Sequence, residues 1–168
     1  VTCAAFRAGV IVIGTRLGYV WKTDVGKGKV DRLVHISSCV QCLSLDGEGR
    51  FCAAAGGDGR VTIVPVLPLP SVEPWVCEHS QQGILGVALC PGYALSGTDS
   101  ALVCAGGLDG RLVLHRRSRF GGQTILHEGE GPITQVAWRT TLIAWANNSG
   151  IKILDAETRQ KVSYIPCR

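Results

Sequence analysis

A turn that contains glycine recurs four times in the sequence, and we call each one a glycine corner. Each corner follows a short run of apolar or small residues and precedes another run of β-forming residues, at Gly18, Gly59, Gly110 and Gly150. The two most complete copies span Phe51–Val64 and Leu102–Leu114, and both contain Ala-Gly-Gly followed by Asp-Gly-Arg. A chain built from such repeats must stack one small unit on the next, which restricts its architecture before any single residue is interpreted.

The spacing of the corners favours four-stranded units. They lie about 40 to 50 residues apart, and a period of about 40 to 45 residues is typical of propeller blades. Asp-Gly between two β-rich runs is a strong hairpin signal, because the tight turn needs positive φ. We therefore interpret Asp58 and Asp109 as turn-forming residues rather than catalytic carboxylates. The sequence predicts an all-β, WD-repeat-like β-propeller.

The repeats divide the chain into about four blades, with approximate boundaries at residues 1–39, 40–79, 80–128 and 129–168. The third unit is longer, with extra residues around Gly92 to Ser100. The chain contains no Met and starts inside a strand-like run, so we interpret it as a piece of a larger ring. We expect its outer blades to expose strand edges, so that the piece does not fold alone.

Composition supports a β fold and gives no sign of nucleic-acid binding. Gly makes up 22 of 168 residues, which leaves little room for a long amphipathic helix. The net charge of +4 is mild. The basic cluster His115–Arg119 is interpreted as a solvated loop, with a contact for acidic partners or anionic lipid as the alternative. We find no run of roughly 20 apolar residues that would span a membrane.

The eight cysteines are interpreted as structural. Cys39 and Cys42 have the spacing of a zinc knuckle, and His35 lies nearby, but no second Cys-x-x-Cys follows. Several other cysteines lie in apolar runs, where a free thiol behaves as a small buried hydrophobe. Zinc binding and disulfides remain as alternatives. Structural cysteines favour a reducing compartment, and hence the cytoplasm.

A search for catalytic motifs returns little. The sequence has no Gly-x-Ser-x-Gly, no Walker loop and no His-Glu-x-x-His. The string His127-Glu128-Gly129-Glu130 could hold a metal or share acid–base chemistry, but we favour a solvated loop between blades. Asn147-Asn148-Ser149 matches a glycosylation sequon and is interpreted as a tight turn. We therefore predict no enzyme activity, cofactor, metal or small-molecule substrate.

Three of the four tryptophans are predicted to pack in or near the core. Trp21, Trp138 and Trp145 lie in strand-like runs, where large aromatic side chains pack between neighbouring sheets. Trp75 follows a proline-bounded link and is expected to be more exposed.

The fourth unit carries a specific resemblance. The stretch Leu126–Asp155 contains His127–Gly131, then Trp138-Arg139, Leu142–Asn148 and Gly150–Ile153. In this pattern it resembles the N-terminal propeller of the vacuolar protein sorting-associated protein 41 family. The similarity extends over nearly the whole chain, although the proline-rich link and the enlarged third unit depart from it.

The resemblance implies a subunit of the HOPS tethering complex. Members of that family combine an N-terminal WD-repeat propeller with an α-solenoid and a C-terminal zinc-binding domain, and the family's zinc ligands lie outside this region. The expected partners are other HOPS subunits and a late-endosomal Rab GTPase, with peripheral association at the late endosome, lysosome or vacuole membrane. The expected role is a non-enzymatic protein-interaction module in vesicle transport.

Two other functions stay open from the residues alone. The first is a WD-repeat scaffold in a different complex, such as a ubiquitin ligase or a nuclear assembly. The second is a propeller enzyme that uses Glu128 and Glu130 as acids.

Overall fold

The protein is described by a computed structural model that covers residues 1–67, 72–95, 102–118 and 121–167. Within these ranges the chain forms sixteen strands and no helix. The first sheet contains β1 (Cys3–Arg7), β2 (Val10–Gly14), β3 (Tyr19–Asp24) and β4 (Val30–His35). The second contains β5 (Val40–Leu45), β6 (Phe51–Gly56), β7 (Arg60–Pro65) and β8 (Trp75–Glu78). The third contains β9 (Ile84–Leu89), β10 (Leu102–Gly107), β11 (Leu112–Arg116) and β12 (Gly122–His127). The fourth contains β13 (Gln135–Arg139), β14 (Leu142–Asn147), β15 (Gly150–Asp155) and β16 (Lys161–Pro166).

Each sheet is an antiparallel meander, because consecutive strands pair with each other in sequence order. Every glycine corner of the sequence joins the second and third strands of its sheet. The predicted all-β propeller fold is therefore confirmed, and the repeat unit corresponds to one four-stranded sheet.

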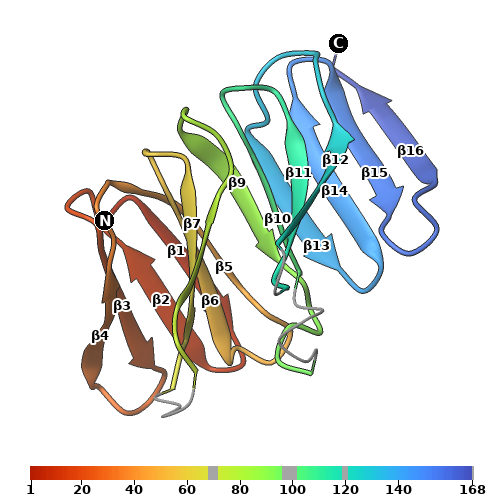
Figure 1. The fold of residues 1–168 in the computed structure, drawn as a ribbon. Helices are drawn as coiled ribbons and strands as arrows, with labels where there is room; N and C mark the ends of the chain where they lie inside the picture. The colour runs from red at the N-terminus through yellow and green to blue at the C-terminus, as the bar shows by residue number, and fades with distance from the viewer. Residues whose placement is uncertain (68–71, 96–101, 119–120, 168) are drawn as a thin grey trace.

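The four sheets stand in a row that does not close. The first strand of each sheet packs against the first strand of the next, from β1 to β5, β9 and β13. Figure 1 shows the first and fourth sheets at opposite ends of the row, with the two chain termini far apart. This arrangement is that of a partial propeller.

The apolar core is divided among three interfaces between neighbouring sheets. One cluster, including Val12, Val20 and Val40, joins the first and second sheets. A second, including Ile63 and Ile84, joins the second and third. A third cluster joins the third and fourth sheets, and it includes Leu112, Ile143 and Trp145. Because the core lies between the sheets, each blade depends on its neighbours for burial.

The tryptophans follow the predictions in part. Trp145 is buried, with only 4% of its surface exposed, whereas Trp21 and Trp138 are half-buried. Trp75 is also half-buried: it is more exposed than Trp145, as expected, but is half-buried like Trp21 and Trp138. It begins β8 opposite Ile63, and this pairing draws it onto the second interface.

Some predicted features lie outside the described residues. They include Pro68 and Pro70 of the link, the extra residues predicted beyond Leu95, and Arg119 of the basic cluster. No helix in the described ranges is long and apolar enough to cross a membrane.

Candidate interaction surface

The glycine corners hold the links between blades. Gly59 has φ of 79°, and a Cβ placed on it would overlap the carbonyl oxygen of Ser80 in the next link. The carbonyl of Gly59 accepts a hydrogen bond from the backbone N–H of His79 at 2.9 Å. The first corner repeats this contact, because the backbone N–H of Ile36 donates to the carbonyl of Gly18 at 2.9 Å. Glycine at the corner thus lets the following link approach closely.

The side chain beside the glycine contacts the preceding link. In the second sheet, the hydroxyl of Ser37 donates to Asp58 Oδ2 at 2.9 Å, and Asp58 Oδ1 accepts the backbone N–H of Arg60 at 3.3 Å. Partial burial opposes ionisation of Asp58, but hydrogen bonds from Ser37 and Ser38 outweigh it and lower the pKa of this carboxyl. Asp58 is therefore a turn-forming and link-holding residue.

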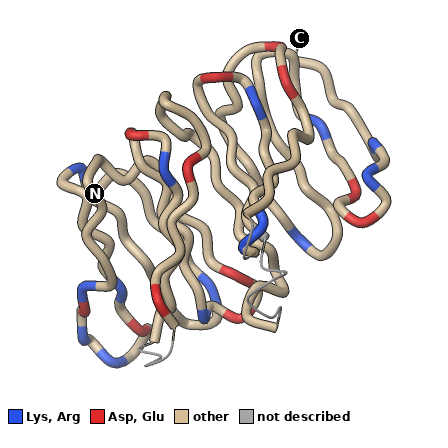
Figure 2. Tube along the Cα trace, in the orientation of Figure 1, with Lys and Arg blue, Asp and Glu red and all other residues tan. Residues whose placement is uncertain are grey.

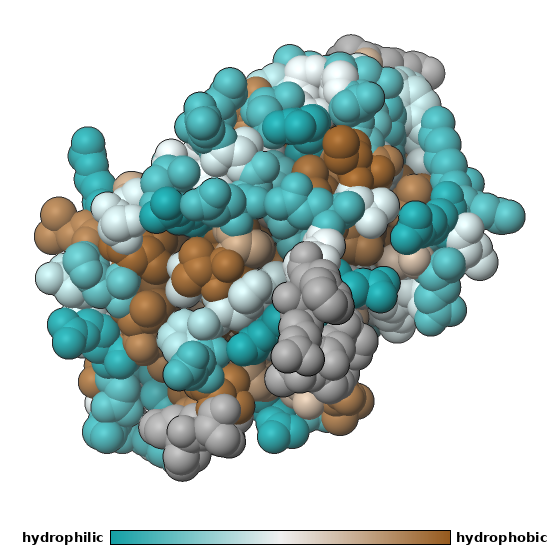
Figure 3. All heavy atoms as spheres, viewed as in Figure 1, coloured by the Kyte–Doolittle hydropathy of each residue, from teal (hydrophilic) through white to brown (hydrophobic). Residues whose placement is uncertain are grey.

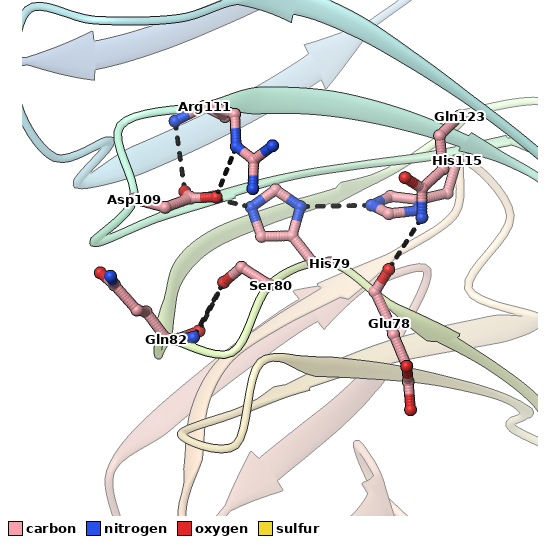
Figure 4. A network of polar contacts seen from close by, with 8 residues as sticks. All are labelled: Glu78, His79, Ser80, Gln82, Asp109, Arg111, His115 and Gln123. Carbon is pink, nitrogen blue, oxygen red and sulfur yellow. Dashed lines mark hydrogen bonds and ion pairs between the residues drawn. The ribbon is translucent and has the colours of Figure 1, made fainter.

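The third corner carries a buried polar network, shown in Figure 4. Asp109 accepts hydrogen bonds from the backbone N–H of Arg111 at 3.2 Å and from its Nε at 3.0 Å. His79 Nε2 lies 3.6 Å from Asp109 Oδ1, and His79 Nδ1 lies 3.2 Å from His115 Nε2. Both imidazoles are almost fully buried.

Burial makes both histidines of this network neutral at pH 7. Burial lowers the pKa of His79 even though Asp109 opposes it, and burial together with His79 lowers the pKa of His115 to about 4. We infer the tautomers from the contacts: a proton on His115 Nε2 is donated to His79 Nδ1, and a proton on His79 Nε2 faces Asp109. The network holds the link to the sheet and offers no reacting group to solvent.

The fourth corner brings the residues of the family-like motif together. Asn147 Oδ1 accepts the backbone N–H groups of Ser149 at 3.0 Å and Gly150 at 3.2 Å. Its Nδ2 donates to Glu130 Oε2 at 3.2 Å and lies 3.3 Å from His127 Nε2. Asn147 is buried by this arrangement, so it acts as a turn residue and its amide is engaged within the protein.

Glu130 is paired with a lysine that the sequence analysis missed. Lys152 Nζ forms an ion pair with Glu130 Oε2, and the hydrogen bonds from Lys152 and Asn147 lower the pKa of Glu130. Glu128, by contrast, is exposed on the link. A general acid needs a carboxyl that stays protonated near pH 7, so Glu130 is unsuited to that role.

The remaining motif residues are spread around this corner. The indole Nε1 of Trp138 donates to the carbonyl of Thr140 at 3.1 Å, and Trp145 lies 5.4 Å from the His127 ring, centroid to centroid. Gly129 is exposed, and the exposed Asn148 lies against Gly131. The motif thus builds one link-to-corner contact rather than a catalytic cluster.

Lys152 has a signal in the sequence that could identify it as a site residue, whereas His79 and His115 have none. Lys152 lies two positions after Gly150, where the other repeats carry apolar residues, namely Val20, Val61 and Leu112. A lysine at a position that is otherwise buried is a signal that alignment of the repeats could have found. His79 and His115 have no such signal, because His79 lies in the link after β8, His115 lies on β11, and the two meet only in the fold.

The cysteines are all free thiols. Cys52 and Cys104 are buried, and burial raises the pKa of Cys42 and of Cys77 to about 12. Such thiols stay protonated at pH 7 and are poor nucleophiles. Among the residues that the structure describes, no group of three or more His, Cys, Asp or Glu side chains could hold a metal ion.

Open cavities lie between the sheets. One of about 380 Å³ is bounded by the first strands of the second, third and fourth sheets. A larger one, of about 730 Å³, lies between β3 and β4 of the first sheet and β7 of the second. Figure 3 shows that apolar side chains also reach the surface around the first sheet. Loops, cavities and apolar surface carried by rigid sheets form a framework suited to binding other proteins.

Comparisons with known proteins agree with this architecture. The family model Beta-prop_Vps41, described as "Vps42 beta-propeller", matches residues 1–168. Similar relatives carry the name vacuolar protein sorting-associated protein 41 homolog. The tomato protein (Solanum lycopersicum) is 34% identical over 165 residues, which is 98% of this chain and 17% of the relative. The human protein (Homo sapiens) is 32% identical over 168 residues, which is 98% of this chain and 19% of the relative.

The chain therefore spans less than a fifth of the length of these relatives. Among solved structures, the crystal structure of the computationally designed Ika8 protein aligns with a TM-score of 0.70 at 18% identity. That alignment covers 98% of this chain and 48% of the designed protein, and it supports the fold alone.

Proposed function

The chain belongs to the Vps41 β-propeller family, and from this premise we propose that it is a non-enzymatic protein-interaction module of a membrane-tethering subunit. The observation that carries the proposal is the family match over residues 1–168. The proposed setting is transport from endosome to lysosome or vacuole, where tethered membranes are brought together before fusion. The proposed partners are other HOPS subunits and a late-endosomal Rab GTPase, with the protein cytoplasmic and peripheral on the membrane.

The proposed mechanism is rigid display. The second and third corners are fixed to the links on both sides of their sheets, and the first and fourth to one link each, so the loops at this end are held in one arrangement. Preorganised loops lose less conformational entropy when a partner binds. Several loops together would form the binding surface, and no single residue is expected to dominate it.

Co-purification tests the proposal. The full-length protein and a variant lacking residues 1–168 would be affinity-purified from cells, and the bound proteins would be identified by mass spectrometry. We expect HOPS subunits or a late-endosomal Rab to be recovered with the full-length protein and to be depleted when the propeller residues are removed. Recovery of a ubiquitin ligase or a nuclear assembly instead, with no tethering subunit, would contradict the proposal.

A further inference from the structure

The larger cavity is lined by a lysine whose ammonium group has no counter-ion among the described residues. Lys22 on β3 is 8% exposed and lines this space of about 730 Å³ between the first and second sheets. Within the described ranges, no hydrogen bond or ion pair joins its Nζ to another residue. An ammonium group without a partner beside apolar walls can bind a carboxylate, because a hydrogen bond between two charged groups is stronger than one between neutral groups.

The acidic residue that lines the cavity already has a basic partner. Asp31 on β4 is the register partner of Lys22 on β3. Its Oδ1 forms an ion pair with Lys29 Nζ at 3.0 Å. Arg32 also lines the cavity, and its guanidinium lies 5.9 Å from the centre of the Tyr19 ring. The wall therefore carries three basic groups against one acidic group, and Figure 2 shows the blue segments gathered at the β3–β4 hairpin.

The rest of the cavity is apolar. Leu33, Val72 and the prolines Pro65 and Pro74 border it, and they can receive hydrocarbon side chains. Pockets of this kind, mostly apolar with a few polar groups, orient a ligand by those polar groups. The volume of about 730 Å³ falls in the range of sites that accept a few side chains.

We propose that this cavity binds a short acidic peptide segment of a partner protein, with an Asp or Glu carboxylate on Lys22 and neighbouring apolar side chains against the floor. Charge complementarity supports a peptide over an anionic membrane, because lipid recognition usually draws on about four to eight basic residues without acidic ones among them. The inference rests on the proposed function as a protein-interaction module and names the chemistry of one partner segment.

The test uses the full-length protein and matched peptides. The probes are fluorescent pentapeptides with a central Asp or Glu between apolar residues, each paired with its Asn or Gln twin, and binding is measured by fluorescence polarisation. We expect at least one acidic peptide to bind about tenfold tighter than its amide twin, as for a hydrogen bond to a charged group. Lys22→Met keeps the buried hydrocarbon stem and should remove this preference.

Three further variants keep the test independent of one substitution. Lys27→Met removes an exposed lysine whose partner is Asp24, away from the cavity, and should leave the preference intact. Lys22→Glu should reverse the preference toward peptides with a central lysine. Near-ultraviolet circular dichroism confirms folding. If both Lys22 variants misfold, Pro74→Trp in the cavity lining should block every peptide in their place.

Several results would overturn the inference. They are equal binding of acidic and amide peptides, an acidic preference that survives Lys22→Met in a folded protein, and Lys22-dependent binding to phosphatidylserine vesicles or inorganic phosphate without binding to peptides. If the protein still recovers tethering subunits while no acidic peptide binds, this inference fails and the proposed function stands.

Discussion

At the scale of single residues, Asn147 uses both ends of its amide group. Its oxygen accepts two backbone N–H groups of the turn, and its nitrogen contacts the preceding link. Asp58 and Asp109 lie directly before the glycine of their own corners and contact Ser37 and His79 of the preceding links. One short polar side chain at each of these corners therefore closes the turn and fixes the link.

Replacing the side chain of Asn147 should destabilise the folded protein. Asn147→Ala leaves the N–H groups of Ser149 and Gly150 without their acceptor, and we expect the free energy of unfolding to fall by about 1–3 kcal/mol. Urea unfolding followed by circular dichroism measures the change. The matched control is Asn148→Ala at the exposed neighbour, which should change stability by less than about 0.5 kcal/mol. Equal effects of the two substitutions would contradict the role assigned to Asn147.

The buried histidines predict a pH dependence. The unfolded chain binds a proton on each histidine near pH 6.5, whereas the folded protein resists protonation of His79 and His115. Stability is therefore full above about pH 6.5 and falls as the pH drops toward 4, by up to about 1.4 kcal/mol per pH unit for His115.

Urea unfolding between pH 7 and pH 5 measures this slope. His127, whose pKa is also lowered by burial and by Lys152, contributes in the same window, so the informative quantity is the difference between the native protein and His115→Gln. We expect a shallower slope in the variant. A slope that does not change would show that His115 is not the titrating group.

At the scale of elements, the hairpins were predictable and the contacts between links and corners were not. Asp-Gly turns and β-branched runs are local signals, so they located the strands around Gly59 and Gly110. The pairing of His79 with His115 joins a link residue to a residue on β11, and nothing local in the sequence indicates it. The motif His127–Glu130 is recognisable in the sequence. Its ion pair is not, because Glu130 pairs with Lys152 on β15.

The contacts at the corners also predict which glycine substitutions lower the free energy of unfolding most. Gly59 and Gly9 both have φ of 79°, but a Cβ on Gly9 meets nothing within 4 Å, whereas a Cβ on Gly59 would overlap the backbone of Ser80. Gly9→Ala should cost about 1–2 kcal/mol for the backbone conformation alone. Gly59→Ala should cost at least about 1–3 kcal/mol more, because the link must move. Similar losses of unfolding free energy for the two variants would argue against the contact.

At the scale of the whole molecule, the row of sheets leaves apolar side chains exposed at its two ends. Phe6 in the first sheet is 66% exposed, and Ile151 in the fourth sheet is 42% exposed. Exposed apolar faces on neighbouring strands favour association. The sequence predicts exposed strand edges on the outer blades, but it does not indicate which apolar side chains lie exposed there.

We expect the 168-residue chain by itself to associate as its concentration rises. Sedimentation velocity would show a growing fraction of larger species, and Phe6→Gln should reduce that fraction because it removes exposed apolar surface. Val25→Gln at an exposed turn is the control and should have a smaller effect. A monodisperse monomer that melts cooperatively would contradict this expectation.

The central claim is that the propeller face binds other subunits of a tethering complex, and cross-linking mass spectrometry of the full-length protein purified with its partners tests it most directly. Exposed lysines such as Lys27 and Lys29 mark the loops of the first sheet, and Lys161 marks the outer strand of the fourth. We expect cross-links from these lysines to HOPS subunits or to a Rab GTPase. Cross-links confined to the protein itself, in a preparation where other regions do cross-link to those subunits, would contradict it.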